Sequence, residues 1–334
     1  MPDDYQLNST GPTQSQVIDI NDDTAPARLS MLVSSVNEKR RIDTILGAQA
    51  EQTRTDAGIK HLVLIAVEKE GAGGVMRLMQ EMSEDERVIW RGARTLREMI
   101  LADDAVKLLC YDSLIEEWLL RLLLLYPLSN VVQAHCIRLI AALAFGNDRF
   151  RRKSGERGVM LCLVRAMENH PSEEMVQLHV CTALTNLAHN SLENRSRFVE
   201  LGGVEVLIGV MVRFKESAKV QRQSCWAVLT LCGSDDISRM IAKQGGDSAI
   251  MNAMLTHRFD AGVQQFGCWA LGNLALSGEE VCRRLKKKGA AEVCRIALET
   301  HGQDAEVLRQ ARNVLGVLSP LGRGMLSSDS SGAL

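Results

Sequence analysis

Cysteine and histidine are the most reactive side-chain types in this chain of 334 residues, which holds nine cysteines and seven histidines. Clusters of them could hold a metal ion or pair a nucleophile with its base. The sequence has neither a Cys-x-x-Cys pair nor the Cys/His spacing of a zinc site. Cysteines recur instead at one repeated place, at Cys181, Cys225 and Cys268, with Cys136 one residue out of register. We interpret them as packing residues, because a free cysteine behaves as a small apolar side chain.

Motifs for catalysis and cofactor binding are also missing from the sequence. GGVE and GAGG contain paired glycines, but there is no GxxxxGK[ST] loop and no GxGxxG motif after a strand. His135 and His179 occupy equivalent places 44 residues apart, with no carboxylate or cysteine beside them in that row. A metal or acid–base site needs such partners. We therefore expect no enzyme activity, no cofactor and no metal site.

Net charge and hydropathy bear on location and partners. The formal charge is -2 and the isoelectric point is about 6.4, which gives no bulk electrostatic reason to bind nucleic acid or an anionic membrane. No apolar run reaches the roughly 18 residues of a membrane span, and MPDDYQ lacks the glycine needed for myristoylation. Nine cysteines without an amino-terminal signal segment indicate a reducing compartment. We expect a cytoplasmic protein, with the nucleus as the alternative.

Two basic runs stand out, Arg149–Lys153 and Arg283–Lys288. Such runs are usually solvated faces, and acidic stretches alternate with them along the chain. No aromatic motif for base stacking accompanies them, so RNA is not the expected ligand. Binding of an acidic protein tail to either run stays open.

A repeat of constant length organises the chain. Valines recur 44, 44, 44, 43 and 44 residues apart, and each begins a similar line such as VQLHVCTALTNLA or VQQFGCWALGNLA. Glycines recur in the same phase. These landmarks are Val88, Val132, Val176, Val220, Val263 and Val307, with Gly158, Gly202, Gly245 and Gly289. Self-similarity at this period predicts a helical solenoid, in which each repeat packs on its neighbours.

One face of each repeated helix carries unusual residues. From Val263 to Ala275 the apolar residues share one side at helical spacing, whereas Phe266, Trp269 and Asn273 lie opposite. A tryptophan directed away from the core side indicates a groove, because such a ring is normally buried. Equivalent places form three rows across the repeats. The rows are Arg138, Thr182, Trp226 and Trp269; Ala142, Asn186, Thr230 and Asn273; and His135, His179, Gln223 and Phe266.

These rows predict a binding groove. Neighbouring helices lie about 8–10 Å apart, which is close to the spacing of alternate residues in an extended peptide. The predicted groove residues are Asn186, Trp226, Thr230, Phe266, Trp269 and Asn273. In the alternative interpretation the asparagines bond a neighbouring helix backbone and the tryptophans pack within the array.

The lines TALTNLAHN, WALGNLALS and WAVLTLCGS, followed in phase by segments such as NRSRFVELGGVEVLIGVM, resemble armadillo repeats. The resemblance covers about Val75 to Leu318 and is strongest from Val132 to Leu298. It implies an all-α, right-handed superhelical solenoid of about six three-helix repeats, with the third helices on the concave face. The repeated glycines would then lie at the turn from the first helix to the second.

The chain is therefore expected to have three parts. Residues 1–35 are polar and contain prolines, which predicts disorder. Residues 36–319 form the repeat array with a helical amino-terminal cap, and residues 320–334 form a disordered Gly- and Ser-rich tail.

The resemblance implies a non-enzymatic scaffold that binds a protein or extended peptide along its concave groove. One alternative is an importin-alpha-like adaptor for basic targeting peptides, since Trp269 and Asn273 match the Trp and Asn pair of that branch. However, Trp226 is followed by Thr230, and Asn186 is preceded by Thr182, so only one repeat carries the full pair. A further alternative is a structural subunit of a large, for example cytoskeletal, assembly.

Overall fold

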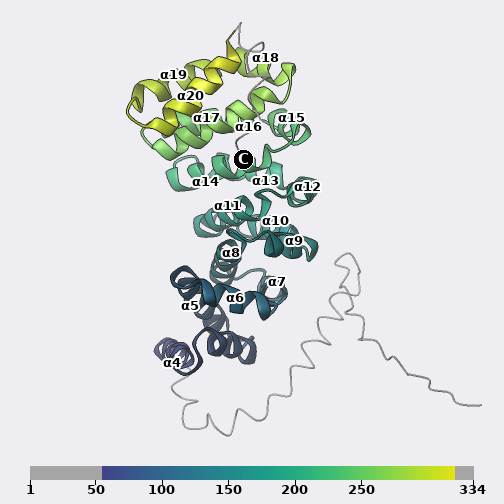
Figure 1. Ribbon diagram of the computed structural model, residues 1–334, viewed down its shortest axis with the longest axis vertical. Helices are drawn as coiled ribbons and strands as arrows, with labels where there is room; N and C mark the ends of the chain where they lie inside the picture. The colour runs from purple at the N-terminus through teal and green to yellow at the C-terminus, as the bar shows by residue number, and fades with distance from the viewer. Residues whose placement is uncertain (1–54, 320–334) are drawn as a thin grey trace, which may run out of the picture. The chain divides into compact units, whose positions relative to one another are not determined.

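The computed structural model describes residues 55–319, which are α-helices joined by short turns with no strand among them (Figure 1). The ends predicted to be disordered, residues 1–35 and 320–334, lie outside the described residues, as does the part of the predicted cap before residue 55. The domain boundaries drawn from the sequence therefore stay predictions.

Fifteen of the helices form five sets of three, with a first helix of 9 residues, a second of 11 and a third of 14 to 16. Their bounds are α6 Asp104–Asp112, α7 Ile115–Leu125 and α8 Asn130–Ala144; α9 Asp148–Glu156, α10 Val159–Asn169 and α11 Glu174–Ala188; α12 Leu192–Glu200, α13 Gly203–Arg213 and α14 Ala218–Leu231; α15 Asp235–Lys243, α16 Gly246–Thr256 and α17 Ala261–Leu276; α18 Glu279–Lys287, α19 Ala290–Thr300 and α20 Ala305–Leu318. The predicted all-α solenoid of three-helix repeats is confirmed.

A partial repeat precedes these sets. Helix α4, Asp56–Glu81, bends at Gly71, where φ is 58°, and α5, Glu86–Ala102, follows it as a third helix. Gly71 lies 43 residues before Leu114, which itself precedes α7 with φ of 52°. The two halves of α4 therefore correspond to the first and second helices of a repeat.

The repeated valine marks the start of each third helix. Its side chain is fully or almost fully buried in all six cases. In four of them a Ser or Asp three residues earlier caps the helix, accepting a hydrogen bond from the valine N–H: Ser129, Ser217, Asp260 and Asp304. The period of the sequence thus reflects a core residue in each repeat and a capping side chain in four of them.

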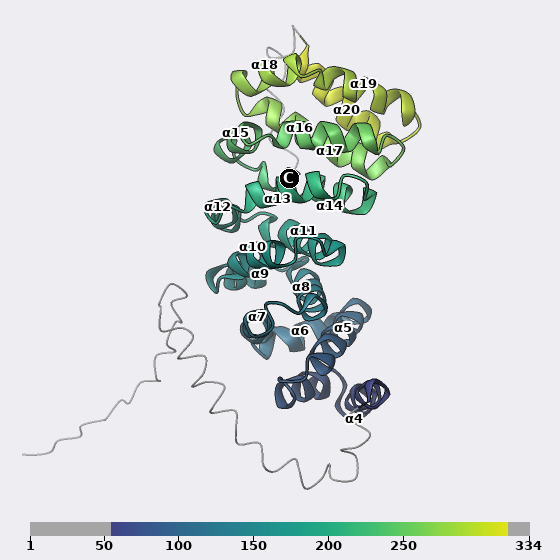
Figure 2. The same ribbon diagram turned by 180° about the vertical axis from the view of Figure 1, so that it is seen from behind.

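The third helices form the inner layer of the stack. Contacts between successive third helices, from α5 through α8, α11, α14 and α17 to α20, are far more extensive than those between successive first or second helices. Elements on the inside of a curved stack lie closest together, so this row is the concave side. Figures 1 and 2 show the third helices along one side and α9, α12 and α15 along the other.

A buried glutamine joins the second helix to the third in four repeats. Gln133 Nε2 donates to the carbonyls of Leu123 and Tyr126 at the end of α7, at 2.8 and 2.9 Å, and the Tyr126 carbonyl also accepts the Ser129 N–H. Gln177, Gln221 and Gln264 repeat this pair of bonds. The angle between the second and third helices is thereby fixed in the same way each time.

The repeated glycines lie at the turn that the resemblance implied, and their backbone there is left-handed. Gly158, Gly202, Gly245 and Gly289 precede the second helices with φ between 75° and 95°. In the first complete repeat Leu114 occupies this place, so one turn is made by a residue with a Cβ. A side chain at such a φ is strained.

Substitution of Gly202 tests this role. Gly202→Ala should lower the free energy of unfolding by about 1–2 kcal/mol, because an L-residue with a side chain disfavours the left-handed region by that amount. A Cβ there would meet no atom within 4 Å, so the cost is conformational and involves no clash. Gly209→Ala, inside α13 and also in open space, should instead raise stability by about 0.5–1 kcal/mol. Urea denaturation measures both, and equal effects would contradict the assignment.

Candidate functional site

An exposed pair of aromatic rings lies on the concave face. Trp226 on α14 stacks on Phe266 on α17 with ring centroids 4.7 Å apart and planes 8° from parallel. Trp226 is 39% exposed, which is high for its size, while Phe266 is half-buried against the core. The two side chains, one from each of two repeats, therefore form a flat apolar platform open to solvent.

Trp269 and Thr230, which were also predicted to line this part of the groove, are less free to contact a ligand. Trp269 is half-buried and packs against the hydrophobic core. The Thr230 hydroxyl donates to the Trp226 carbonyl at 3.0 Å, within its own helix. The structure therefore brings Trp226 and Phe266 together and gives Trp269 and Thr230 supporting positions.

The two asparagines differ in what they contact. Asn186 Nδ2 donates to the Ala141 carbonyl of α8 at 2.8 Å, so it joins adjacent third helices, as the alternative interpretation states. Asn273 is half-buried, and its amide forms no hydrogen bond with another residue of the described part of the chain. An amide can bond a backbone N–H and C=O together. Asn273, one helical turn from Trp269, is thus the asparagine with free bonding capacity.

A cationic cluster lies on the inner face at its amino-terminal half. Arg97 on α5 and Arg138 on α8 are half-buried and close enough for Arg138 to help burial lower the pKa of Arg97. Burial, together with the charge of Arg138, also lowers the pKa of His135 and brings that of His179 to about 4. We call Arg97, Arg138, His135 and His179 the arginine–histidine cluster.

Within residues 55–319 neither arginine of this cluster forms an ion pair. The nearest acid, Glu98, pairs with Arg94 at 3.0 Å. The sequence rows contained Arg138 and His135, but the cluster was missed because Arg97 falls outside the rows. The feature of the sequence that indicates the cluster is Arg138, which occupies the place held by Trp226 and Trp269 in later repeats.

Acid should destabilise the array through His179. Its folded pKa of about 4 lies below the ordinary value of 6.5, so the unfolded chain binds more protons between these pH values and stability falls as pH falls. At pH 5 this amounts to about 2 kcal/mol relative to pH 7. His179→Gln should remove that part of the pH dependence in urea denaturation. His61→Gln, at an exposed place on α4, is the control; a dependence unchanged by His179→Gln would contradict the assignment.

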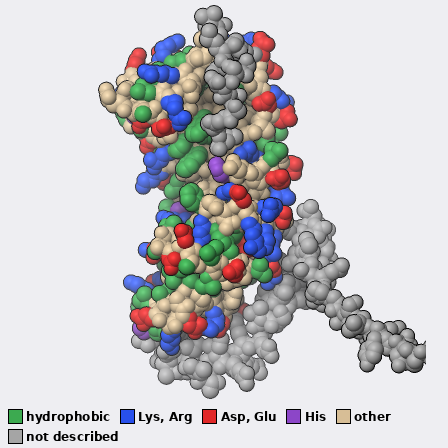
Figure 3. Space-filling model, viewed as in Figure 1, with side chains coloured by type: hydrophobic (Ala, Val, Ile, Leu, Met, Phe, Trp, Pro, Cys, Tyr) green, Lys and Arg blue, Asp and Glu red, His purple; other side chains and the backbone are tan. Residues whose placement is uncertain are grey.

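The first basic run is divided between packing and solvent. Arg151 is 7% exposed, donates to the Ala144 carbonyl at 3.2 Å and pairs with Asp148. Arg149 and Arg152 are exposed, and Figure 3 shows basic side chains gathered at the edge of the molecule where α9 lies.

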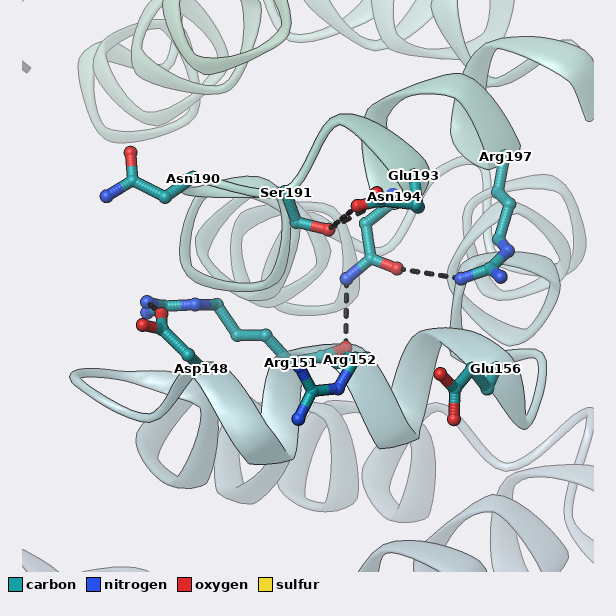
Figure 4. Close-up of a pocket in the computed structure, with 9 residues that line it drawn as sticks. All are labelled: Asp148, Arg151, Arg152, Glu156, Asn190, Ser191, Glu193, Asn194 and Arg197. Carbon is teal, nitrogen blue, oxygen red and sulfur yellow. Dashed lines mark hydrogen bonds and ion pairs between the residues drawn. The ribbon is translucent and has the colours of Figure 1, made fainter.

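A cavity of about 440 Å³ lies beside this run, between α9 and α12 (Figure 4). Asn194 crosses it, with Nδ2 donating to the Arg151 and Leu187 carbonyls at 2.9 and 2.8 Å. The charged lining residues are three of each sign: Arg151, Arg152 and Arg197, with Asp148, Glu156 and Glu193. This balance gives the cavity no preference for an ion of either sign.

Residues of the second basic run hold a buried carboxylate. Asp247 on α16 is fully buried and contacts Arg284 Nε at 2.7 Å and Lys288 Nζ at 2.9 Å, both from the next repeat. Burial opposes ionisation of Asp247, but the bonds from Arg284 and Lys288 outweigh it and hold its pKa below the usual range. These two cations therefore join repeats, whereas Lys286 and Lys287 remain exposed.

Asp247→Asn should lower the free energy of unfolding at pH 7 by about 2–3 kcal/mol, because it leaves two partly buried cations without a counter-charge. Glu279→Gln is the matched control: its ion pair with Arg283 is 71% and 74% exposed, so no measurable change is expected. Thermal and urea denaturation report both. Equal stability of the two variants would show that Asp247 contributes no more than a surface ion pair.

All nine cysteines are buried free thiols, as predicted for packing residues. Burial raises the pKa of Cys136, Cys162 and Cys225 to about 12, so these thiols are protonated at neutral pH. Among residues 55–319 no group of His, Cys, Asp and Glu is arranged to hold a metal ion. None of the helices described here is both long and apolar enough to cross a membrane.

The three-helix repeat, the turn glycines and the inner row of third helices define an armadillo repeat protein. The chain belongs to the family described as LRRK2 ARM repeat, which matches residues 115–320. No curated protein matches the sequence of this chain.

Solved structures of designed proteins share this fold. An engineered protein has 23% sequence identity, a TM-score of 0.64, and coverage of 74% of this chain and 98% of its own. A designed armadillo repeat protein in complex with the peptide (KR)4 has 21% identity and a TM-score of 0.62, covering 75% of this chain and 100% of its own. A structure of the cadherin and beta-catenin interaction has 13% identity and a TM-score of 0.53, covering 79% of this chain and 57% of that one.

Proposed function

We propose that this protein is a non-catalytic scaffold that binds an extended segment of a partner protein along the concave row of third helices. The observation that carries the proposal is the exposed Trp226–Phe266 platform on that row. Solvent exposure of stacked rings is unfavourable unless a partner covers them. The free amide of Asn273 lies on the same helix as Phe266 and supplies backbone recognition.

The structural relatives support a peptide as the ligand class. The designed armadillo protein is in complex with the peptide (KR)4, and beta-catenin interacts with cadherin. These statements concern those proteins, and at such low sequence identity the structural likeness shows a shared fold alone. They are consistent with use of the inner face here.

An importin-alpha-like adaptor for basic peptides receives less support. Arg97 and Arg138 would repel a basic segment that extends along the inner face from the Trp226–Phe266 platform. A structural subunit bound through convex surfaces also receives less support. Cations of both basic runs already serve packing, since Arg151, Arg284 and Lys288 bind within the array.

Peptides selected from a random library against the full chain test the proposal. Trp226→Ala should weaken binding of the selected peptides at least tenfold, measured by fluorescence anisotropy, because stacked apolar contact is lost. Asn273→Ala should weaken it about threefold to tenfold through the lost amide bonds.

Phe259→Ala is the control, since Phe259 is 73% exposed in the turn before α17 and outside the inner row. Its substitution should leave affinity unchanged. Peptides that bind all three variants as tightly as the natural sequence would occupy another surface, which would rule out the groove.

A further inference from the structure

We propose that the partner segment is acidic at one end and apolar at the other, with the acidic end on the arginine–histidine cluster and the apolar end on the Trp226–Phe266 platform. This inference rests on the proposed function and adds the chemistry and spacing of the partner. The occupant is a segment of another protein.

The acidic end follows from the charges on the inner face. Arg97 and Arg138 come from adjacent third helices, α5 and α8, and no carboxylate of residues 55–319 pairs with them. Two half-buried guanidinium groups that disfavour each other are stabilised by an added anion. Their planar forks suit a carboxylate or phosphate oxygen pair better than a point charge would.

The histidines beside the arginines have a different role. His135 stacks on Trp90, with ring centroids 5.3 Å apart, and His179 is 6% exposed. Both have a lowered pKa, so both are neutral near pH 7 and supply neutral hydrogen-bonding nitrogens. The permanent positive charge of the cluster therefore belongs to the arginines.

The apolar end follows from the other half of the row. The residue rows in this half hold Gln223, Trp226, Thr230, Phe266, Trp269 and Asn273, none of which carries a charge. The exposed Arg222 lies one helical turn before Trp226, at the edge of the platform beside Gly262. A lysine or arginine placed on the ring platform would therefore lose hydration without gaining a counter-ion. An aliphatic or aromatic side chain gains buried area there.

The separation of the two ends sets the length of the motif. From α8 to the junction of α14 and α17 there are two to three helix steps, each about 8–10 Å. An extended chain advances about 3.3 Å per residue. The acidic group and the apolar residue of the partner should therefore be separated by about five to nine residues.

Fluorescein-labelled peptides test this directly on the full chain. Each probe carries a block of four glutamates and a Phe-Leu pair, joined by Ser/Thr spacers of about three, seven or twelve residues and made in both chain orders. The spacer of about seven should bind best in one order. A matching probe with lysines replacing the glutamates should bind at least tenfold more weakly.

Arg97→Gln with Arg138→Gln should weaken the glutamate probe at least tenfold, while a probe with serines replacing the glutamates should change less than twofold. Arg138→Lys, which keeps the charge but loses the planar fork, should weaken the glutamate probe less than Arg138→Gln does. Circular dichroism confirms that each variant is folded. Arg213→Gln is the control and should leave the affinity unchanged, because Arg213 is exposed at the end of the second helix α13, outside the inner row.

The outcomes separate this inference from the proposed function. If Trp226→Ala weakens the probes and the arginine variants do not, the groove binds peptides but the acidic end is wrong. If affinity is independent of spacer length, the two-ended motif is wrong. If neither Trp226→Ala nor the arginine variants matter, both proposals fail.

One further variant checks the source of the acidic segment. This chain itself carries Asp19, Asp22 and Asp23 beside the apolar residues Val17 and Ile18. If these residues occupied the cluster, replacing the three aspartates with asparagine would raise probe affinity about tenfold. That result would overturn a partner in trans; unchanged affinity supports it.

Discussion

The double hydrogen bond from one buried glutamine is the constraint on which the geometry of this array depends. In four repeats the glutamine amide binds two carbonyls at the end of the second helix. The second of these carbonyls also accepts a backbone N–H from the turn that follows, so the first is the acceptor that depends on the glutamine for its donor. The two bonds fix the angle between the second and third helices of these repeats. Because the third helices form the inner layer, the same bonds help to set the spacing of side chains on the concave face from α8 to α17.

The periodic features of this protein could be predicted from the sequence, because each repeat has to meet the same local structural requirements. The glycine at the start of each second helix is a backbone requirement, and the valine after each cap is a core residue; both recur whatever the surface does. The fold class, the helix order and the packing role of the cysteines follow from these rules. Two of the residue rows also placed Trp226 and Phe266 on successive third helices.

Contacts that depend on one particular neighbouring residue could not be predicted from the spacing of the repeats. Asn186 bonds a carbonyl 45 residues earlier, whereas Asn273 at the equivalent place does not, and no local pattern distinguishes them. Asp247 looks like an ordinary surface acid until Arg284 and Lys288 of the next repeat cover it. The role of the basic runs could not be predicted for the same reason, because the sequence does not show which cations bond to groups within the array. The charged contacts of Asp247 lie between repeats, so they cannot be inferred from the sequence of one repeat alone.

The residue that directly follows each second helix also makes contacts that differ from one repeat junction to the next. Tyr126, His170, His257 and His301 each bind a carbonyl of the preceding repeat at 2.7–2.9 Å. Phe214 holds the equivalent place in α12–α14 and has no polar atom to do so. At that junction the Ser217 hydroxyl binds Glu174 instead, at 2.6 Å and at the surface. In a solenoid each junction contributes its own coupling energy. The junctions of this array are therefore held together in different ways, and the one beside Phe214 depends on the Ser217–Glu174 bond and on the buried bond from Asn194 to the Arg151 carbonyl.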